Sequence, residues 1–493
     1  MLLLGIDVGT SSIKVSVIDA NDGRVVASAQ YPEKEATILS ERPGWAEQEP
    51  ETWWRYTSQS ISKVCSSGNF NPRDIGAIGI AYQMHGMVIV DKHKKVLRSS
   101  IIWCDSRAVE TGDKAYEGLG EDYCHAHLLN SPGNFTASKL AWVKEHEPEI
   151  FDKTDKLMLP GDYIAMQLTG EITTSPSALS EGILWDFKTG TVASEVMKYY
   201  DFPDFIIPHI QPVFSVHGLV ASRVAESLGL PSKIPVSYKA GDQPNNALSL
   251  NVMQPGEIAA TAGTSGVIYA VTDQLVGDPK SRVNSFAHVN HSSLQKSIGV
   301  LLCINGTGII NRWMRDVTGN QFSYKQMNEQ AAAIPLGSEG LSVLPFGNGA
   351  ERMLGNKLTG AELHNLQLTI HQPAHLFRAT QEGIVCAFRY GLDILRENGV
   401  NPSVIRAGKA NMFLSPLFTE LFVNLTGTPV ELYENDGSVG AAIGAGIGAG
   451  IYKNPDDAFK HHQPIAWAEP DNHAAAYSAL YDRWRGILDK SLS

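Results

Sequence analysis

The sequence predicts an α/β protein of two domains that are built on one plan. Residues 2–18 form an apolar strand, a Gly-Thr-Ser loop and a second strand, and residues 258–271 repeat this succession. The repeat begins 254 residues after the first copy (263 − 9 for the two loop glycines), close to half of the 493-residue chain. Such an offset indicates an internal duplication. We expect domains of residues 1–248 and 249–493.

The remainder of the chain alternates predicted strands with predicted helices. Residues 75–81 and 299–304 are continuous apolar runs typical of buried strands, while 51–64 and 381–397 have helical periodicity. The glycine-rich segment 436–450 predicts a helix that packs closely against a neighbour. Strand-rich beginnings followed by this alternation indicate α/β layers in both halves. We therefore expect the ligand site in the cleft between two domains.

Charge and composition exclude several classes of partner. The chain has 40 Lys and Arg against 52 Asp and Glu, for a net charge of −12, and contains no basic block. Nucleic-acid binding without sequence specificity needs such a block, so we expect no nucleic-acid partner. The longest run of glycine and apolar residues, 439–452, is shorter than the ~20 residues that cross a bilayer. Five scattered cysteines without a CxxC motif indicate reduced thiols. We expect a cytoplasmic protein without a membrane partner.

The two Gly-Thr-Ser loops are candidates for binding phosphate groups. Thr10 and Ser11 lie in the first loop, and Gly263 and Thr264 lie in the second. Glycine leaves room for a phosphate group, and successive backbone N–H groups and hydroxyls can donate to it. The alternative for either loop is a tight hairpin. Because the loops recur at half-chain spacing, we favour a triphosphate held from both sides.

Two aspartates are candidates for catalytic work. Asp7 lies beside the first loop, where the second copy has Thr261. A carboxylate there would repel phosphate unless it acts through a cation such as Mg²⁺, and the alternative is a cap or turn residue. Asp242 follows Gly241 and precedes a predicted helix. It is a plausible general base for an alcohol, and the alternative is an ordinary helix N-cap.

Two further polar segments follow predicted strands. Gln83–Gly86 offers hydrogen-bonding groups and an apolar wall to a small polar ligand, or else contains a buried histidine in a turn. Trp103–Arg107 offers a ring for a sugar face and charge-assisted hydrogen bonds, or else an internal Asp–Arg pair that holds a loop. A GxGxxA match at 444–449 lies inside a predicted helix and is rejected as a dinucleotide site. Motifs of P-loop enzymes and protein kinases are absent.

The order of these motifs resembles the FGGY carbohydrate kinases over nearly the whole chain. The segments that carry the resemblance are Gly5–Ser12, Gly44–Pro50, Gln83–Gly86, Trp103–Arg107, Lys139–Trp142 and Gly241-Asp242. The resemblance implies an actin/Hsp70-like (ribonuclease H-like) fold of two domains, with a duplicated βββαβα core and an interdomain cleft. It also implies ATP as co-substrate and Mg²⁺. Within the family, Gln83–Gly86 is most similar to the xylulokinases.

The family also implies roles for individual residues. Asp242 would be the general base on the terminal hydroxyl of the sugar, and Asp7 would position Mg²⁺–ATP, with the ion held through water. Sugar contacts are expected for Gln83, Met84, His85, Trp103, Asp105, Arg107 and Gln243. Nucleotide contacts are expected for Thr10, Ser11, Gly263, Thr264, Gly308, Gly408 and Asn411.

Two positions depart from the family pattern. Gln243 follows the aspartate where the family usually has asparagine, and Ala407 precedes Gly408 where it usually has glycine. The resemblance implies phosphorylation of D-xylulose at O5. The alternatives are another ketose or polyol (ribulose, sedoheptulose or glycerol), or a non-catalytic nucleotide-dependent binding protein. A homodimer is expected from the family alone.

Overall fold

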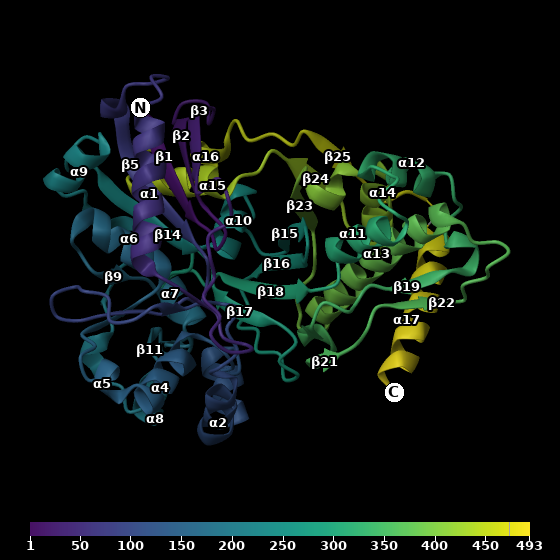
Figure 1. The fold of residues 1–493 in the computed structure, drawn as a ribbon, viewed down its shortest axis with the longest axis horizontal. Helices are drawn as coiled ribbons and strands as arrows, with labels where there is room; N and C mark the ends of the chain where they lie inside the picture. Colours follow the sequence, from purple (N-terminus) through teal and green to yellow (C-terminus); the bar gives the residue numbers. More distant parts are fainter. Residues whose placement is uncertain (473) are drawn as a thin grey trace.

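Two β-sheets form the centres of the two halves of the molecule (Figure 1). The computed structural model covers residues 1–493, and every residue except 473 is described. The first sheet has the order β13-β14-β5-β1-β2-β3. Its strands are β1 (Leu2–Val8), β2 (Ile13–Asp19), β3 (Val25–Tyr31), β5 (Ile75–Tyr82), β13 (Phe214–Leu219) and β14 (Pro235–Gly241).

The second sheet has the order β17-β18-β16-β15-β23-β24-β25. Its strands are β15 (Glu257–Ala262), β16 (Gly266–Thr272), β17 (Asn284–Ala287), β18 (Ile298–Ile304), β23 (Val404–Gly408), β24 (Val430–Tyr433) and β25 (Ala466–Ala468). The central order β18-β16-β15-β23-β24 repeats β3-β2-β1-β5-β14 of the first sheet. The predicted duplication is therefore confirmed at the level of strand order.

Helices complete the repeated unit. The first copy runs β1-β2-β3-α1-β5-α6-β14, and the second runs β15-β16-β18-α13-β23-α14-β24. The predicted βββαβα core is therefore confirmed. In the first copy, the connection between β5 and β14 is long and contains other elements besides the core helix α6. The predicted helix at 381–397 begins earlier, at Pro373. The helices are α1 (Pro50–Cys65), α6 (Pro160–Thr169), α13 (Pro373–Glu397) and α14 (Pro416–Thr426).

The register of the parallel strands decides where the loops meet. In the first sheet β1 and β14 both run parallel to β5, with Val8 and Gly241 each paired to Tyr82. The carboxyl ends of three strands therefore lie at one edge of the sheet. In the second sheet β15 and β24 likewise run parallel to β23. Ligands bind at such edges because the loops that follow the strands converge there.

Each unit ends in a helix, α10 (Asp242–Ser249) and α15 (Gly437–Gly448), and these two helices pack together. The glycine-rich helix α15 comes from the second half of the sequence but covers β1, β5 and β14 of the first sheet (Figure 1). A Cβ added to Gly5 or Gly79 would lie under 2 Å from a carbonyl oxygen of α15, which explains why these strand residues are glycine. The predicted tight packing of this helix is confirmed.

The two halves also meet along the free edge of β17. Asn130 donates to the Ser285 carbonyl at 2.7 Å and accepts from the Ser285 N–H at 2.9 Å. Two residues further along β17, the Ala287 carbonyl accepts from Ser177 and the Ala287 N–H donates to Ser180. An edge strand has backbone N–H and carbonyl groups with no neighbouring strand to bond to. Side chains of the first half of the chain bond to these groups of β17.

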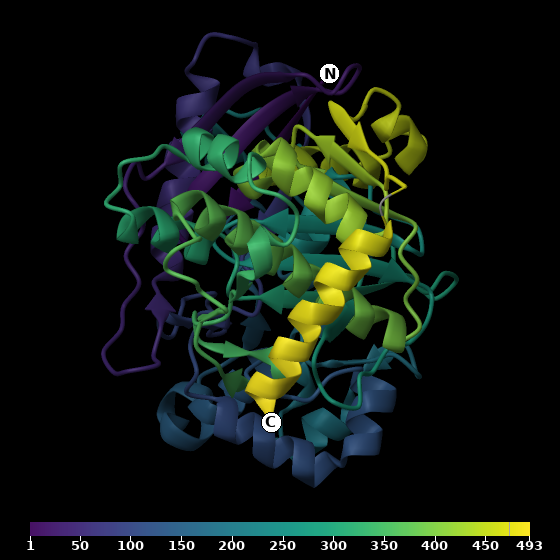
Figure 2. The same ribbon diagram turned by 90° about the vertical axis from the view of Figure 1, so that its right-hand side faces the viewer.

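The other elements surround these layers. Figure 2 shows the C-terminal helix α17 (Ala474–Leu492) crossing the outer face of the second half. There α17 contacts α13, α14 and β19 (Ser342–Leu344). In the described part of the chain no helix is long and apolar enough to cross a membrane. The other α-helices of four or more residues in the described part of the chain are α2 (Val109–Leu119), α4 (Thr136–His146), α5 (Pro148–Phe151), α7 (Pro176–Glu181), α8 (Ser194–Tyr199), α9 (Ser222–Leu228), α11 (Gly308–Val317), α12 (Tyr324–Ala332), α16 (Pro455–Phe459) and α17 (Ala474–Leu492). The other strands of three or more residues are β6 (Val88–Val90), β8 (Lys156–Met158), β19 (Ser342–Leu344) and β22 (Glu362–His364).

Candidate active site

Two buried carboxylates lie at the carboxyl edge of the first sheet, near enough for the charge of Asp7 to act on Asp242. Asp7 is the penultimate residue of β1, and Asp242 opens α10 directly after β14. Burial and the nearby charge of Asp7 raise the pKa of Asp242 to about 7. Burial and Asp436 raise the pKa of Asp7 to about 6, while Lys14 opposes this shift. A carboxylate with a pKa near neutrality is suited to take a proton from an alcohol.

The beginning of α15 holds Asp7 in place. A Cβ added to Gly437, the first residue of α15, would lie 2.3 Å from Oδ2 of Asp7. The preceding residue, Asp436, caps the helix by accepting from the Ser438 N–H at 2.9 Å and pairs with Lys14. Lys14 was not predicted as a site residue. Its place opposite Asp7 in the β1–β2 register is the signal that points to it.

Gln243, Met84 and Gln83 surround Asp242 and the backbone that precedes it. The backbone and the side chain of Gln243 lie close enough to the Asp242 carboxylate to lower its pKa against the effect of burial. Met84 is buried against the backbone of Gly241, where an added Cβ would lie 2.6 Å from Met84 Cγ. Gln83 is also buried and accepts from the Thr10 hydroxyl at 3.2 Å. The structure therefore brings the predicted segments around Gln83 and Asp242 together.

His85 reaches from the first domain toward the second. Its ring contacts Phe135 at a centroid distance of 4.8 Å and Phe286 of β17 at 5.5 Å. Burial and the charge of Lys139 lower the pKa of His85 to about 3, so the imidazole is neutral at neutral pH. A neutral histidine between two aromatic rings can hydrogen-bond a polar ligand without adding charge.

The Trp103–Arg107 segment is divided between the protein surface and the protein interior. Trp103 is 53% exposed and donates to the Thr10 hydroxyl at 3.0 Å. Asp105 is buried, pairs with Arg107 at 2.7 Å and accepts from the Ala46 N–H. Arg107 also pairs with Glu47. Asp105 and Arg107 thus have the arrangement of an internal ion pair that holds a loop, which was the alternative to sugar contact.

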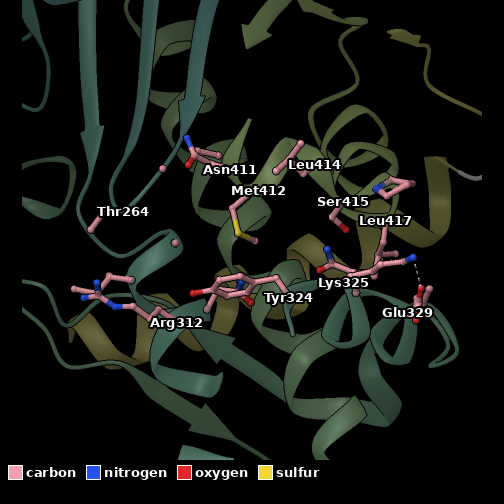
Figure 3. Close-up of a pocket in the computed structure, with 18 residues that line it drawn as sticks. Thr264, Arg312, Tyr324, Lys325, Glu329, Asn411, Met412, Leu414, Ser415 and Leu417 are labelled. Carbon is pink, nitrogen blue, oxygen red and sulfur yellow. Dashed lines mark ion pairs between the residues drawn. The ribbon is translucent and has the colours of Figure 1, made fainter. Parts of the chain in front are cut away.

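A cavity of about 910 Å³ lies in the second domain (Figure 3). Four residues expected to contact nucleotide line it: Gly263, Thr264, Gly308 and Asn411. The Gly308 N–H, at the start of α11, donates to the Gly263 carbonyl at 2.8 Å, so loop and helix are joined. Figure 3 shows Thr264 and Arg312 at one end of the cavity and the ion pair of Lys325 with Glu329 at the other.

Three residues expected at the nucleotide lie outside the lining of this cavity. Thr10 and Ser11 belong to the first-domain loop, and Gly408 ends β23 beside Asn435. Arg312 and Tyr324 do line the cavity but were not predicted. Arg312 lies one turn into α11 and Tyr324 begins α12, so neither belongs to a glycine-rich loop and local sequence offered no signal for them.

Arg352 was also missed by the sequence analysis. It donates to the Asn284 side chain at 2.8 Å, and the ion pairs found among the described residues do not include it. Its charge acts on the pKa of His85 and, with Asp242, on that of Cys303. The preceding residue, Glu351, accepts from two backbone N–H groups of the β18–α11 turn. The second domain therefore places the positive charge of Arg352 near His85 and Cys303.

Comparison with known proteins gives matches over almost the whole chain. The sequence model for the N-terminal domain of the FGGY family of carbohydrate kinases matches residues 2–249, and that for the C-terminal domain matches 258–449. A xylulose kinase of Bacillus subtilis is 28% identical over 503 aligned positions, covering 98% of this chain and 96% of that protein.

Solved structures match the fold equally well. The xylulose kinase from Rhodospirillum rubrum has a TM-score of 0.88 at 25% identity and covers 99% of both chains. The gluconate kinase from Lactobacillus acidophilus has a TM-score of 0.91 at 22% identity, over 100% of this chain and 98% of that one. The second likeness concerns the fold alone. The two-domain α/β architecture predicted from the sequence is confirmed, and it is shared by proteins named for different sugars.

Proposed function

Because this chain belongs to the FGGY family of carbohydrate kinases, we propose that it transfers the γ-phosphoryl group of ATP to O5 of D-xylulose. The observation that carries the proposal is the position of Asp242, at the carboxyl end of β14, with a pKa raised to about 7 and with Asp7 opposite. The cavity in the second domain supplies room for the nucleotide on the other side of the cleft.

The proposed reaction is an in-line displacement in which the protein mainly positions and neutralises charge. Asp242 accepts the proton of the O5 hydroxyl as O5 bonds to the γ-phosphorus. The bond from that phosphorus to the β–γ bridging oxygen breaks, and ADP leaves with the electron pair. The products are ADP, D-xylulose 5-phosphate and the proton taken by Asp242. A positioned general base contributes about 10²–10⁴-fold to such a step.

The residues present fit a magnesium ion held through the nucleotide. The charge of Asp7 raises the pKa of Asp242, so a cation near these two carboxylates would favour their ionised forms. No group of three His, Cys, Asp or Glu residues among those described forms a metal cage. Asp7 would therefore hold the ion through water, with phosphate oxygens as the other ligands. Mg²⁺ supplies charge neutralisation at the phosphates when it is bound.

Two features of the chain support the choice of a ketose. The relatives that align over nearly the full length are named xylulose kinases. Met84 lies against Gly241, and the His85 N–H donates to Glu181, whose pKa the neighbouring Asp242 raises. Since gluconate and glycerol kinases share the fold, the fold by itself does not select the sugar. Ribulose, sedoheptulose and glycerol are therefore included as competing acceptors in the test.

The test is an ADP-release assay with a panel of these acceptors, using the native chain, Asp242→Asn and the control Asp152→Asn, an exposed aspartate outside the site. We expect D-xylulose to give the highest kcat/KM. Asp242→Asn should lower kcat by about 10²–10⁴-fold while calorimetry still detects sugar and ATP binding. Full turnover of Asp242→Asn would remove Asp242 as the base, and a higher kcat/KM with another acceptor would replace D-xylulose.

A further inference from the structure

Two buried ionisable side chains that the proposed reaction does not use flank His85. Lys139 is fully buried, and Glu181 is 1% exposed. His85 has a backbone φ of 62°, a left-handed conformation that costs energy in a residue with a β-carbon. Its N–H donates to Oε1 of Glu181 at 3.3 Å, and its carbonyl accepts from Nζ of Lys139 at 2.8 Å. The two side chains therefore hold both sides of the strained residue.

The His85 ring is held by the same segment. Nδ1 lies 3.2 Å from the backbone carbonyl oxygen of Glu181. A carbonyl oxygen can only accept a hydrogen bond, so Nδ1 must carry the ring proton. Because the imidazole is neutral, Nε2 then has a free lone pair. Among the described residues no group is hydrogen-bonded to Nε2, and the ring lies beside Phe286 of the second domain.

Glu181 also lies next to the catalytic aspartate. A Cβ added to Gly241 would be 2.7 Å from Oε2 of Glu181, and this oxygen has no hydrogen-bond partner. Burial, Asp242 and Asp162 raise the pKa of Glu181 well above its usual range, with Lys139 opposing. Burial and these neighbouring carboxylates thus favour the protonated form of Glu181. It can hold His85 without placing a second negative charge beside Asp242.

We propose that Glu181 and Lys139 are positioning residues that fix His85 in its left-handed conformation and Nδ1–H tautomer, so that Nε2 accepts a hydrogen bond from a hydroxyl of the acceptor. This inference rests on the proposed function, since it concerns the sugar side of the same cleft. It adds a requirement for the substrate: the acceptor presents a hydroxyl donor at His85. A deoxy analogue without that group leaves Nε2 unpaired and binds more weakly.

Kinetics of three variants test the positioning role. Glu181→Gln keeps a carbonyl acceptor for the His85 N–H and should retain the KM for sugar within about twofold. Glu181→Ala and Lys139→Met remove one contact each, and each should raise the KM for sugar by about tenfold, the effect of about 1.4 kcal/mol. The KM for ATP should not change. An unchanged sugar KM in Glu181→Ala, with the variant folded by circular dichroism, would overturn the role of Glu181.

Nitrogen-15 NMR of the histidine rings in the native full-length chain tests the tautomer without any turnover. The His85 signal, assigned by its loss in His85→Gln, should show a protonated Nδ1 and a bare Nε2 between pH 6 and 8. D-xylulose should shift the Nε2 resonance. A proton on Nε2 would overturn this inference while leaving the kinase proposal intact. Conversely, failure of D-xylulose turnover would leave the tautomer result standing.

Discussion

Asp242 illustrates, at the scale of one residue, how a site can be reactive at the expense of stability. Burial and the charge of Asp7 keep the pKa of Asp242 near 7, so that the carboxylate is basic enough to take a proton from a hydroxyl. The same shift means that ionising the folded protein at Asp242 is unfavourable. Activity and stability should therefore respond to pH in opposite directions.

The pH dependence of turnover tests the first half of this argument. Only the ionised form of Asp242 can act as the base, so kcat/KM for the sugar should fall about tenfold per pH unit below about 7. The measurement is kcat/KM from pH 5 to 9 with ATP saturating throughout. A profile that stays flat down to pH 5 would contradict the assignment.

The stability of Asp242→Asn tests the second half. The folded pKa lies above the value of about 4 for an unfolded aspartate, so between about pH 4 and 7 the folded state binds more protons and loses stability as pH rises. Asparagine removes that loss. We expect Asp242→Asn to have a higher Tm than the native chain at pH 8 and an equal Tm at pH 4. A lower Tm of Asp242→Asn at pH 8 would contradict the conclusion that the ionised Asp242 destabilises the folded state.

At the scale of one element, helix α15 connects the two halves through its first turn. Its N-terminus carries the partial positive charge of the helix dipole toward Asp7, which stabilises a carboxylate there. Gly437 allows this approach because it has no side chain. The Lys14–Asp436 pair fixes the same turn to β2. The surroundings of Asp7 in the first domain therefore depend on a helix from the second half of the sequence.

Gly437→Ala tests this dependence. The added methyl would lie 2.3 Å from Asp7 Oδ2 and must displace the carboxylate, so we expect kcat to fall at least tenfold with the KM for D-xylulose nearly unchanged. The control is Gly486→Ala in α17, where a Cβ meets open space. That change should leave kcat unaltered and stabilise the helix by up to about 1 kcal/mol. Equal kcat in both variants would show that Asp7 does not need its present position.

At the scale of the whole molecule, two of the contacts that join the domains lie far apart in sequence. One is the pair of helices α10 and α15, and the other is the edge of β17, whose outward backbone groups bond to Asn130, Ser177 and Ser180. These contacts bring Phe286 against His85. The position of His85 relative to the second domain is therefore fixed by contacts at this edge.

Asn130→Ala tests the contacts at this edge. The change removes the two hydrogen bonds between the Asn130 side chain and the Ser285 backbone, so the buried N–H and carbonyl groups of Ser285 lose their partners. This loss should lower the free energy of unfolding by about 1–3 kcal/mol. It should also raise the KM for D-xylulose, because Phe286 no longer holds its place against His85. The exposed Asn69→Ala serves as control and should change neither quantity. Denaturant unfolding and sugar kinetics measure both effects, and native-like stability would argue against this role of the contacts.

Much of this protein follows from local sequence. Apolar runs indicate β1 and the buried strand β5, and the alternation of apolar and polar residues indicates β2. The recurrence of Gly-Thr-Ser at half-chain spacing indicates the duplication. The pairing of Gly241 with Asp242 pointed to the candidate base. These features depend on residues that are neighbours in the chain, where strand periodicity and turn chemistry act directly.

Contacts between distant residues were decided by the tertiary structure alone. Whether Asp105 and Arg107 face a sugar or each other, and which groups surround His85, depends on side chains brought together from separate elements. The packing of α15 on the first sheet likewise depends on tertiary contacts, in which its backbone carbonyls lie against Gly5 and Gly79. A sequence records which residues can make such contacts, whereas burial and distance, which set their charge and strength, exist only once the chain has folded.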